Sequence, residues 1–139
     1  MSDRQSDTFA RRYGRWALIA GSAEGMGIAY AERFARRGLD LVLLDRDGAG
    51  LEAQAKTLAD GGFRMTAICA GRNQSPEDLA DLVARLREAG AEYIFMVNST
   101  PELNEAAMKA GADELVRNGL NLSVVLTATL DRLGVEVKA

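Results

Sequence analysis

The sequence predicts a single α/β domain built on a five-stranded parallel sheet. Its 139 residues are 47% hydrophobic, which is enough to form the core of one ordinary domain. Short apolar runs alternate five times with amphipathic helical patterns, an arrangement typical of parallel strands joined by helices. The segment Gly21-Ser22-Ala23-Glu24-Gly25-Met26-Gly27 separates the first apolar run from the first helical pattern, as expected of a tight strand-to-helix turn.

The apolar runs are the predicted strands. They lie near residues 16–20, 40–45, 64–69, 92–97 and 113–117. The second run is apolar from Leu41 to Leu44, as in a strand inside a sheet, whereas the third includes Arg64 and Thr66, as in an edge strand. This contrast favours the strand order 3-2-1-4-5, with 2-1-3-4-5 as the alternative.

The predicted helices follow from start and stop signals. They span about Met26–Arg37 and Gly48–Asp60, a segment from Ser75-Pro76 onward, a segment from Thr100-Pro101 to Gly111, and a segment from Leu122 to Leu133. Ser75 and Thr100 each precede a proline and an acidic residue, which is typical of a capped helix N-terminus. Residues 1–12 and the last five are expected to be disordered or frayed, so the domain is predicted over residues 13–139.

Composition excludes several classes of function. The net charge of -3 gives no basic surface for nucleic acid. No apolar stretch approaches the roughly 18 residues that span a bilayer, and the polar start lacks a signal-peptide core, so we expect a soluble, cytoplasmic protein. The chain has no histidine, and its single cysteine, Cys69, ends an apolar strand and is expected to be a buried small hydrophobe. No metal site is predicted.

The spacing of three glycines is the best indication of function. Gly21, Gly25 and Gly27 follow the pattern G-x-x-x-G-x-G, which lets the backbone approach a ligand and presents helix N-terminal N–H groups to an anion. A dinucleotide pyrophosphate fits this description. Asp45 ends the second strand about 20 residues later, where a carboxylate would bind a ribose hydroxyl, although a solvated loop position would explain it as well. The predicted cofactor-binding residues are Gly21, Ser22, Glu24, Gly25, Met26, Gly27, Asp45, Arg46 and Asn98.

The loop after the fourth strand contributes Asn98 to this set. In the favoured strand order, Asn98 and the glycine loop face one crevice, at the switch point between strands one and four. The neighbouring Ser99 and Thr100 could contact a cofactor ribose there, or simply cap the helix that follows.

Residues 9–69 resemble the start of a short-chain dehydrogenase/reductase, through Tyr13 to Gly27 and Leu43-Leu44-Asp45-Arg46. This resemblance implies a three-layer Rossmann-like domain in which the glycines hold the pyrophosphate and Asp45 holds the adenosine ribose, favouring NAD. Arg46 could instead accept a 2'-phosphate and admit NADP, although Glu24 would repel that phosphate.

The chain departs from this family's pattern after residue 69. The family's catalytic Tyr-x-x-x-Lys pair is missing, because the residues four places after the three tyrosines are Ala17, Phe34 and Val97. Hydride transfer to a carbonyl needs such a proton donor. We therefore predict no catalytic residues.

The second half, from about Ser75, loosely resembles the closing part of flavodoxin-like cobalamin-binding domains, through Ala110-Gly111-Ala112-Asp113 and Asn118-Gly119. That family's Asp-x-His-x-x-Gly signature is impossible without histidine, so cobalamin is not expected. The two resemblances together suggest an engineered or chimeric protein with a junction near residues 69–75. A natural truncated relative is the alternative.

Three functions remain as predictions. The first is non-catalytic binding of a dinucleotide, NAD in preference to NADP. The second is a designed or chimeric structural domain whose glycine loop is empty. The third is a truncated short-chain dehydrogenase/reductase relative that needs a partner chain, and an oligomer fits any of the three.

Overall fold

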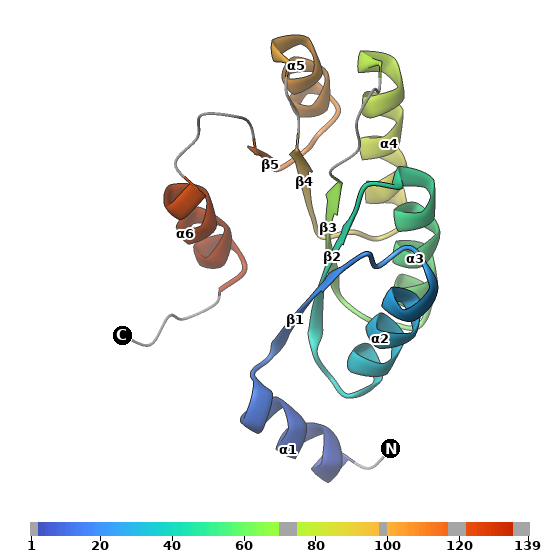
Figure 1. The fold of residues 1–139 in the computed structure, drawn as a ribbon, viewed down its shortest axis with the longest axis vertical. Helices are drawn as coiled ribbons and strands as arrows, with labels where there is room; N and C mark the ends of the chain where they lie inside the picture. Colours follow the sequence, from blue (N-terminus) through green and yellow to red (C-terminus); the bar gives the residue numbers. More distant parts are fainter. Residues whose placement is uncertain (1–2, 70–74, 98–99, 117–121, 135–139) are drawn as a thin grey trace.

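The computed structural model describes residues 3–69, 75–97, 100–116 and 122–134 of the chain (Figure 1). The elements are α1 (Asp3–Tyr13), β1 (Trp16–Ala20), α2 (Gly25–Arg36), β2 (Asp40–Asp45), α3 (Gly48–Asp60), β3 (Met65–Cys69), α4 (Pro76–Glu88), β4 (Tyr93–Val97), α5 (Pro101–Lys109), β5 (Glu114–Val116) and α6 (Leu122–Arg132). The predicted strands and helices are therefore present. None of the described helices is long and apolar enough to cross a membrane.

Local side-chain chemistry fixes the helix starts as predicted. Ser75 Oγ accepts a hydrogen bond from the Asp78 N–H at 3.1 Å, and Thr100 Oγ1 accepts one from the Leu103 N–H at 3.3 Å. Each bond satisfies an N–H group that has no partner inside the helix. The capped starts of α4 and α5 are therefore confirmed.

Each strand pairs in parallel with the next strand in the chain, in the order β1-β2-β3-β4-β5. The predicted α/β domain with a five-stranded parallel sheet is confirmed, but the strand order differs from both predicted orders, 3-2-1-4-5 and 2-1-3-4-5. The prediction took Arg64 and Thr66 as signs of an edge strand. In the structure, Arg64 lies just before β3, and Thr66 is a buried residue of a central strand, between Val42 and Tyr93.

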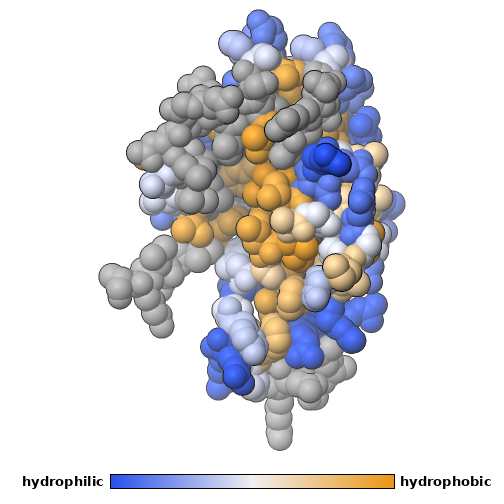
Figure 2. All heavy atoms as spheres, viewed as in Figure 1, coloured by the Kyte–Doolittle hydropathy of each residue, from blue (hydrophilic) through white to orange (hydrophobic). Residues whose placement is uncertain are grey.

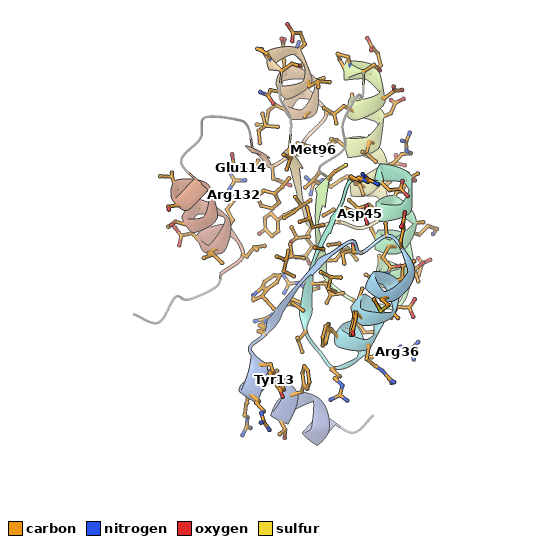
Figure 3. All side chains as sticks on the ribbon, in the orientation of Figure 1. Tyr13, Arg36, Asp45, Met96, Glu114 and Arg132 are labelled. Atoms are coloured by element: carbon orange, nitrogen blue, oxygen red, sulfur yellow. The ribbon has the colours of Figure 1, made fainter. Side chains whose placement is uncertain are left out.

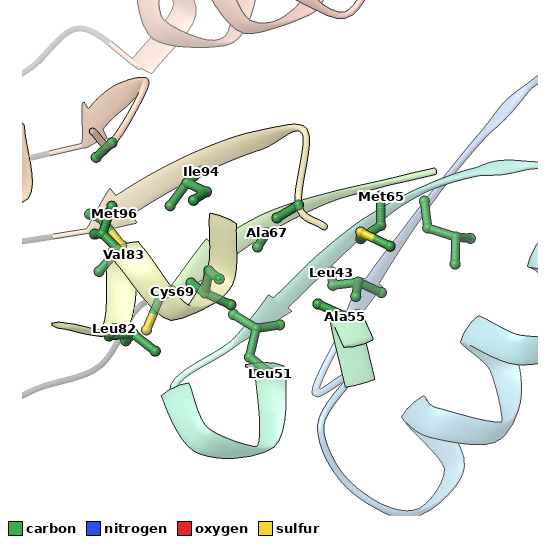
Figure 4. Close-up of a cluster of buried hydrophobic side chains, with 14 of the residues drawn as sticks. Leu43, Leu51, Ala55, Met65, Ala67, Cys69, Leu82, Val83, Ile94 and Met96 are labelled. Atoms are coloured by element: carbon green, nitrogen blue, oxygen red, sulfur yellow. The ribbon is translucent and has the colours of Figure 1, made fainter. Parts of the chain in front are cut away.

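One face of the sheet carries the hydrophobic core. A right-handed crossover between neighbouring parallel strands returns on the same side each time, so α2, α3, α4 and α5 all cover this face (Figure 1). Alternate residues of the strands meet the helices in a buried cluster, part of which is drawn in Figure 4; it includes Leu43, Met65, Ala67, Cys69, Ile94 and Met96 from the sheet and Leu51, Ala55, Leu82 and Val83 from α3 and α4. Cys69 is buried in this cluster.

The opposite face of the sheet is partly uncovered. Helix α6 lies on this side (Figure 1), and a band of apolar residues is visible along the sheet (Figure 2). Leu18 of β1 is 65% exposed, whereas Val42 and Ile68, on the next two strands, are half-buried and Phe95 of β4 is buried. Exposure of this face is therefore greatest at β1.

Charged side chains join the starts of the strands. Arg15 Nε donates to Asp40 Oδ2 at 2.7 Å, linking the start of β1 to β2. Arg64 donates two hydrogen bonds of 2.8 Å to the Glu92 carboxylate, linking the starts of β3 and β4. These bonds hold the pKa of Glu92 below its ordinary value of 4.5 and raise the pKa of Arg64.

Two arginine side chains also connect β5, the last strand, to neighbouring elements. Arg87 Nη2 donates to Asp113 Oδ2 at 2.7 Å, and the same oxygen accepts the Ile94 N–H at 2.8 Å, so Asp113 connects α4, β4 and the start of β5. Arg132 extends from α6 toward Glu114 (Figure 3), and its Nη1 donates to the Asp113 carbonyl at 2.8 Å. One arginine therefore ties α6 to β5.

The structure has a helix, α1, where residues 1–12 were expected to be disordered or frayed. The Phe9 ring lies 4.7 Å from the Tyr13 ring and 6.1 Å from the Phe34 ring of α2, measured between centroids. The Arg37 guanidinium lies over Phe9 at 4.7 Å. These contacts attach α1 to α2. Because they form only after the chain folds, polar composition alone gave no sign of them.

The Arg64–Glu92 pair gives a test of the strand order. We expect the losses of unfolding free energy in Arg64→Gln and Glu92→Gln to be non-additive in the double variant, because each variant removes the same interaction. Arg15→Gln and Glu92→Gln should be additive, because β1 and β4 are not neighbours. Urea unfolding of the wild type, the three single variants and the two double variants measures both quantities. Coupling between Arg15 and Glu92 instead would indicate that β1 lies beside β4.

The lowered pKa of Glu92 predicts a pH effect. A carboxylate with a lower pKa in the folded chain stabilises it above the unfolded-state pKa, near 4.5, and this contribution is lost as the pH falls through the folded-state value. We expect Glu92→Gln to lose less stability than the wild type between about pH 5 and pH 3. Thermal melts across this range measure the difference. Glu88→Gln, at an exposed position of α4, is the control and should follow the wild type.

Candidate functional site

The glycine loop follows β1 and has positive φ angles that glycine readily adopts. Gly21 has a φ of +72° and Gly25 a φ of +46°, in the region that other residues rarely adopt. The Gly21 N–H donates to the Leu44 carbonyl at 2.8 Å, so the loop stays joined to the end of β2. The loop therefore turns sharply from β1 into α2 beside the end of the second strand.

Gly27 allows α2 to pack directly on this loop. A Cβ atom at Gly27 would lie 1.9 Å from the Gly21 carbonyl oxygen and 3.0 Å from Ser22 Cα. No side chain fits in that space. The first turn of α2 therefore lies against the backbone of Gly21 and Ser22.

The N-terminus of α2 has no side-chain cap. Glu24 is the N-cap residue but its side chain makes no capping hydrogen bond, and the first turn of α2 has no acidic residue. In contrast, the side chains of Asp47, Ser75 and Thr100 cap α3, α4 and α5. No side chain therefore accepts a hydrogen bond from the first N–H groups of α2, which suits an anion, although the Gly27 N–H donates to the Glu24 carbonyl at 2.9 Å.

Asp45 lies beneath the loop and binds its backbone. Its Oδ2 accepts the Ala23 N–H at 2.9 Å and its Oδ1 accepts the Asp47 N–H at 2.9 Å. Only 9% of Asp45 is exposed, and Figure 3 shows it at the end of β2. The predicted ribose-binding residue therefore also connects the glycine loop to the start of α3, while the neighbouring Arg46 is exposed.

Ser22 and Met26 lie at opposite extremes of exposure. The Ser22 side chain is fully buried, and its Oγ has no hydrogen-bond partner among the described residues. A buried hydroxyl without a partner costs free energy, so a ligand or a water molecule that bonded to it would be favoured. Met26, in contrast, is 76% exposed in the first turn of α2.

The structure does not form the crevice predicted between strands one and four. The end of β4 lies three strand spacings from β1, roughly 14 Å. Asn98 lies outside the described residues. Thr100 next to it caps α5, the simpler of its two predicted roles.

Asp47 and Gly50 lie beside the glycine loop, although the sequence analysis did not include them among the site residues. Asp47 caps α3 by accepting the Gly50 N–H at 3.1 Å. A Cβ atom at Gly50 would lie 2.9 Å from Ala23 Cβ, so Gly50 lets the start of α3 approach the glycine loop. The spacing Asp-x-x-Gly at a helix start was the available signal.

Comparison with known proteins identifies the family. The model of the family described as short chain dehydrogenase matches residues 15–131. The 7beta-hydroxysteroid dehydrogenase of Clostridium sardiniense is 34% identical over 106 residues, which cover 70% of this chain and 38% of that protein. The inactive hydroxysteroid dehydrogenase-like protein 1 of Homo sapiens is 46% identical over 50 residues, 36% of this chain and 15% of that protein. The chain therefore belongs to the short chain dehydrogenase family, and its α/β fold is Rossmann-like.

Solved structures include similar proteins. A structure of a 7beta-hydroxysteroid dehydrogenase is 24% identical with a TM-score of 0.42, covering 91% of this chain and 49% of that chain. The short-chain dehydrogenase from Sphingobium yanoikuyae in complex with NADPH is 24% identical with a TM-score of 0.36, covering 89% and 69%. The chain spans less than half the length of the curated relatives named above.

The comparisons confirm the family that was predicted for the first half of the chain and assign the second half to the same family. The match passes through residues 69–75 and continues to residue 131. A flavodoxin-like second half, and a chimeric or engineered origin with a junction near residues 69–75, are therefore not supported.

The contact at Gly27 gives a stability test of the loop. We expect Gly27→Ala to lower the unfolding free energy by about 3 kcal/mol, because its Cβ atom forces the loop and helix apart. Gly25→Ala, which meets no neighbour and only strains the backbone, should cost about 1 kcal/mol. Urea unfolding measures both. Equal losses in the two variants would mean that α2 does not pack on Gly21.

Proposed function

We propose that this chain binds an NAD-type dinucleotide at the glycine loop and supplies no catalytic residues of its own. The observation that carries this proposal is the start of α2, which follows a glycine loop and has neither a side-chain cap nor an acidic residue in its first turn. A pyrophosphate is a ligand of matching charge. Membership of the short chain dehydrogenase family supports the same ligand.

The residues at the loop fit the pyrophosphate. Gly21 and Gly25 have open space where a side chain would lie, so nothing there blocks its approach, and Gly27 lets α2 pack on the loop. The Ser22 hydroxyl is buried without a described partner. The proposed donors are the N–H groups of Gly25 and Met26, because the Gly27 N–H already donates to the Glu24 carbonyl. A bound NAD would supply a hydride acceptor, or a donor when reduced.

Charge near the ribose favours NAD in this proposal. Asp45 has two oxygens that each accept one backbone N–H, and each carboxylate oxygen has a further lone pair for a ribose hydroxyl. Glu24 and Asp45 would both repel a 2'-phosphate, whereas the exposed Arg46 would attract it. NAD is therefore the proposed ligand and NADP the competitor that Arg46 admits.

The proposal of binding without catalysis is supported by the residues that follow the tyrosines. None of the three tyrosines has a lysine four residues later. The relative from Homo sapiens is itself called inactive. An enzyme completed by a partner chain stays a prediction.

A carboxylate at position 26 gives a sharp test. We expect Met26→Asp to weaken binding of NAD and NADH at least about tenfold, because it places a negative charge in the first turn of α2 beside the pyrophosphate. The same charge interacts favourably with the helix dipole, so the melting temperature should not fall. Isothermal titration with NAD, NADH, NADP and NADPH, beside thermal melts, measures both effects.

Met108→Asp is the matched control, since Met108 is an exposed methionine on α5, far along the sheet from the loop. It should bind as the wild type does. No saturable binding by the wild type, or equal binding by the wild type and Met26→Asp, would rule the proposed site out. Tighter binding of NADPH than of NADH would reverse the proposed preference.

A further inference from the structure

Five arginines gather where the last turns of α1 and α2 meet. We call them the arginine surface; they are Arg11 and Arg12 of α1, Arg33 and Arg36 of α2, and Arg37, the C-cap residue of α2. The two turns are in contact, since the Phe9 ring of α1 lies 6.1 Å from the Phe34 ring of α2, measured between centroids. Tyr13 and Arg36 mark this end of the molecule in Figure 3. Because β1 and β2 begin here, the arginine surface and the glycine loop lie at opposite ends of the strands.

The helix dipoles do not account for this much positive charge. A helix C-terminus carries roughly half a negative charge, so a single arginine would offset both turns. The acidic residues of the two helices are Glu32 in α2 and Asp3 and Asp7 in the first half of α1, and the arginines outnumber them. Positive charge is therefore in excess at this end, although the whole chain has a net charge of -3.

Three arginines of the arginine surface form no ion pair within the described part of the chain. Arg12 lies over the Tyr13 ring at 5.5 Å, and neither Arg33 nor Arg36 has a carboxylate partner among the described residues. In contrast, three arginines farther along the sheet are paired with carboxylates; the pairs are Arg64–Glu92, Arg85–Glu52 and Arg87–Asp113. A guanidinium group presents five N–H donors in a fork that matches a carboxylate. Arg12, Arg33 and Arg36 therefore have donors available for carboxylates of another molecule.

Two exposed tyrosines accompany these arginines. Tyr13 is 62% exposed and Tyr30 is 55% exposed. Arg33 and Arg37 follow Tyr30 at helical spacing, so these three residues share one side of α2. A tyrosine ring offers an apolar face to a partner, and its hydroxyl can form a hydrogen bond. The arginine surface thus combines guanidinium groups with aromatic rings, the residue types that are enriched at protein–protein interfaces.

We propose that the arginine surface binds an acidic segment of another protein, whose carboxylates pair with Arg12, Arg33 and Arg36. The rest of the chain has a net negative charge, which repels a long polyanion such as a nucleic acid, whereas a short acidic segment meets the positive surface alone. A membrane surface would need exposed apolar side chains that insert among the lipids. At the described arginine surface, the large apolar side chains that are more than half exposed are Tyr13 and Tyr30, which both carry a hydroxyl. Charge and side-chain type therefore favour an acidic protein segment.

Binding of a labelled oligoglutamate peptide to the full chain tests this proposal. We expect fluorescence anisotropy to show saturable binding that weakens as salt is added, and the double variant Arg33→Gln/Arg36→Gln to bind at least about tenfold more weakly. Both arginines are exposed, so the double variant should stay folded in thermal melts. The matched control is Lys56→Gln/Lys109→Gln, which removes the same charge from exposed positions on α3 and α5 and should bind as the wild type does.

A thymidine oligonucleotide and vesicles of phosphatidylserine and phosphatidylcholine are the competing ligands. We expect both to bind more weakly than the peptide at the same ionic strength. Tighter binding of either ligand, or no saturable binding of the peptide by the wild type, overturns the proposal. Equal losses in the two double variants also overturn it, because only the total charge of the chain would then matter. The arginine surface lies at the opposite ends of the strands from the glycine loop, so the proposal does not depend on dinucleotide binding.

Discussion

The order of the strands is the constraint on which the rest of the structure depends. Each strand pairs with the next strand in the chain, so every right-handed connection returns its helix to the same face of the sheet. The core therefore lies on one side, Leu18 is left exposed on the other, and the glycine loop sits at the end of the sheet. If the strands were instead added on both sides of β1, the helices would cover both faces of the sheet, and the glycine loop would lie in a crevice between the two halves.

The elements themselves could be predicted because their signals are local. Ser75 and Thr100 cap α4 and α5 with hydrogen bonds to N–H groups three residues away, an interaction that the sequence displays directly. The glycine loop is local in the same sense, since the backbone angles of Gly21 and Gly25 are ones that glycine alone adopts without strain. The family of the first half followed from this loop together with Asp45.

The strand order could not be predicted, because the charges that join the strand starts are compatible with more than one order. Arg15, Asp40, Arg64 and Glu92 alternate in sign in the observed order β1-β2-β3-β4. Their signs also alternate when the strands are read as 3-2-1-4. Only the observed pairing of Arg64 with Glu92 separates the two, and that contact spans 28 residues of sequence.

The hydrogen bonds from side chains to the backbone could not be predicted from the sequence for a related reason. The sequence suggested a ligand role for Asp45 from its place at the end of a strand, but its partners are the N–H groups of Ala23 and Asp47, which every residue carries. Helix α1 was missed because its anchor, Phe34, lies in another helix. In both cases the decisive partner is set by the fold and not by residue type.

The hydrogen bonds that Asp45 accepts couple the conformation of the glycine loop to its affinity for a ligand. By holding Ala23 and Asp47 together, this carboxylate preorganises the loop before any ligand arrives, so less conformational entropy remains to be lost on association. The affinity of the site is then partly a property of the apo protein. Replacing Asp45 would act on the ensemble of loop conformations as well as on any contact with a ribose, and a weaker complex would report the sum of the two.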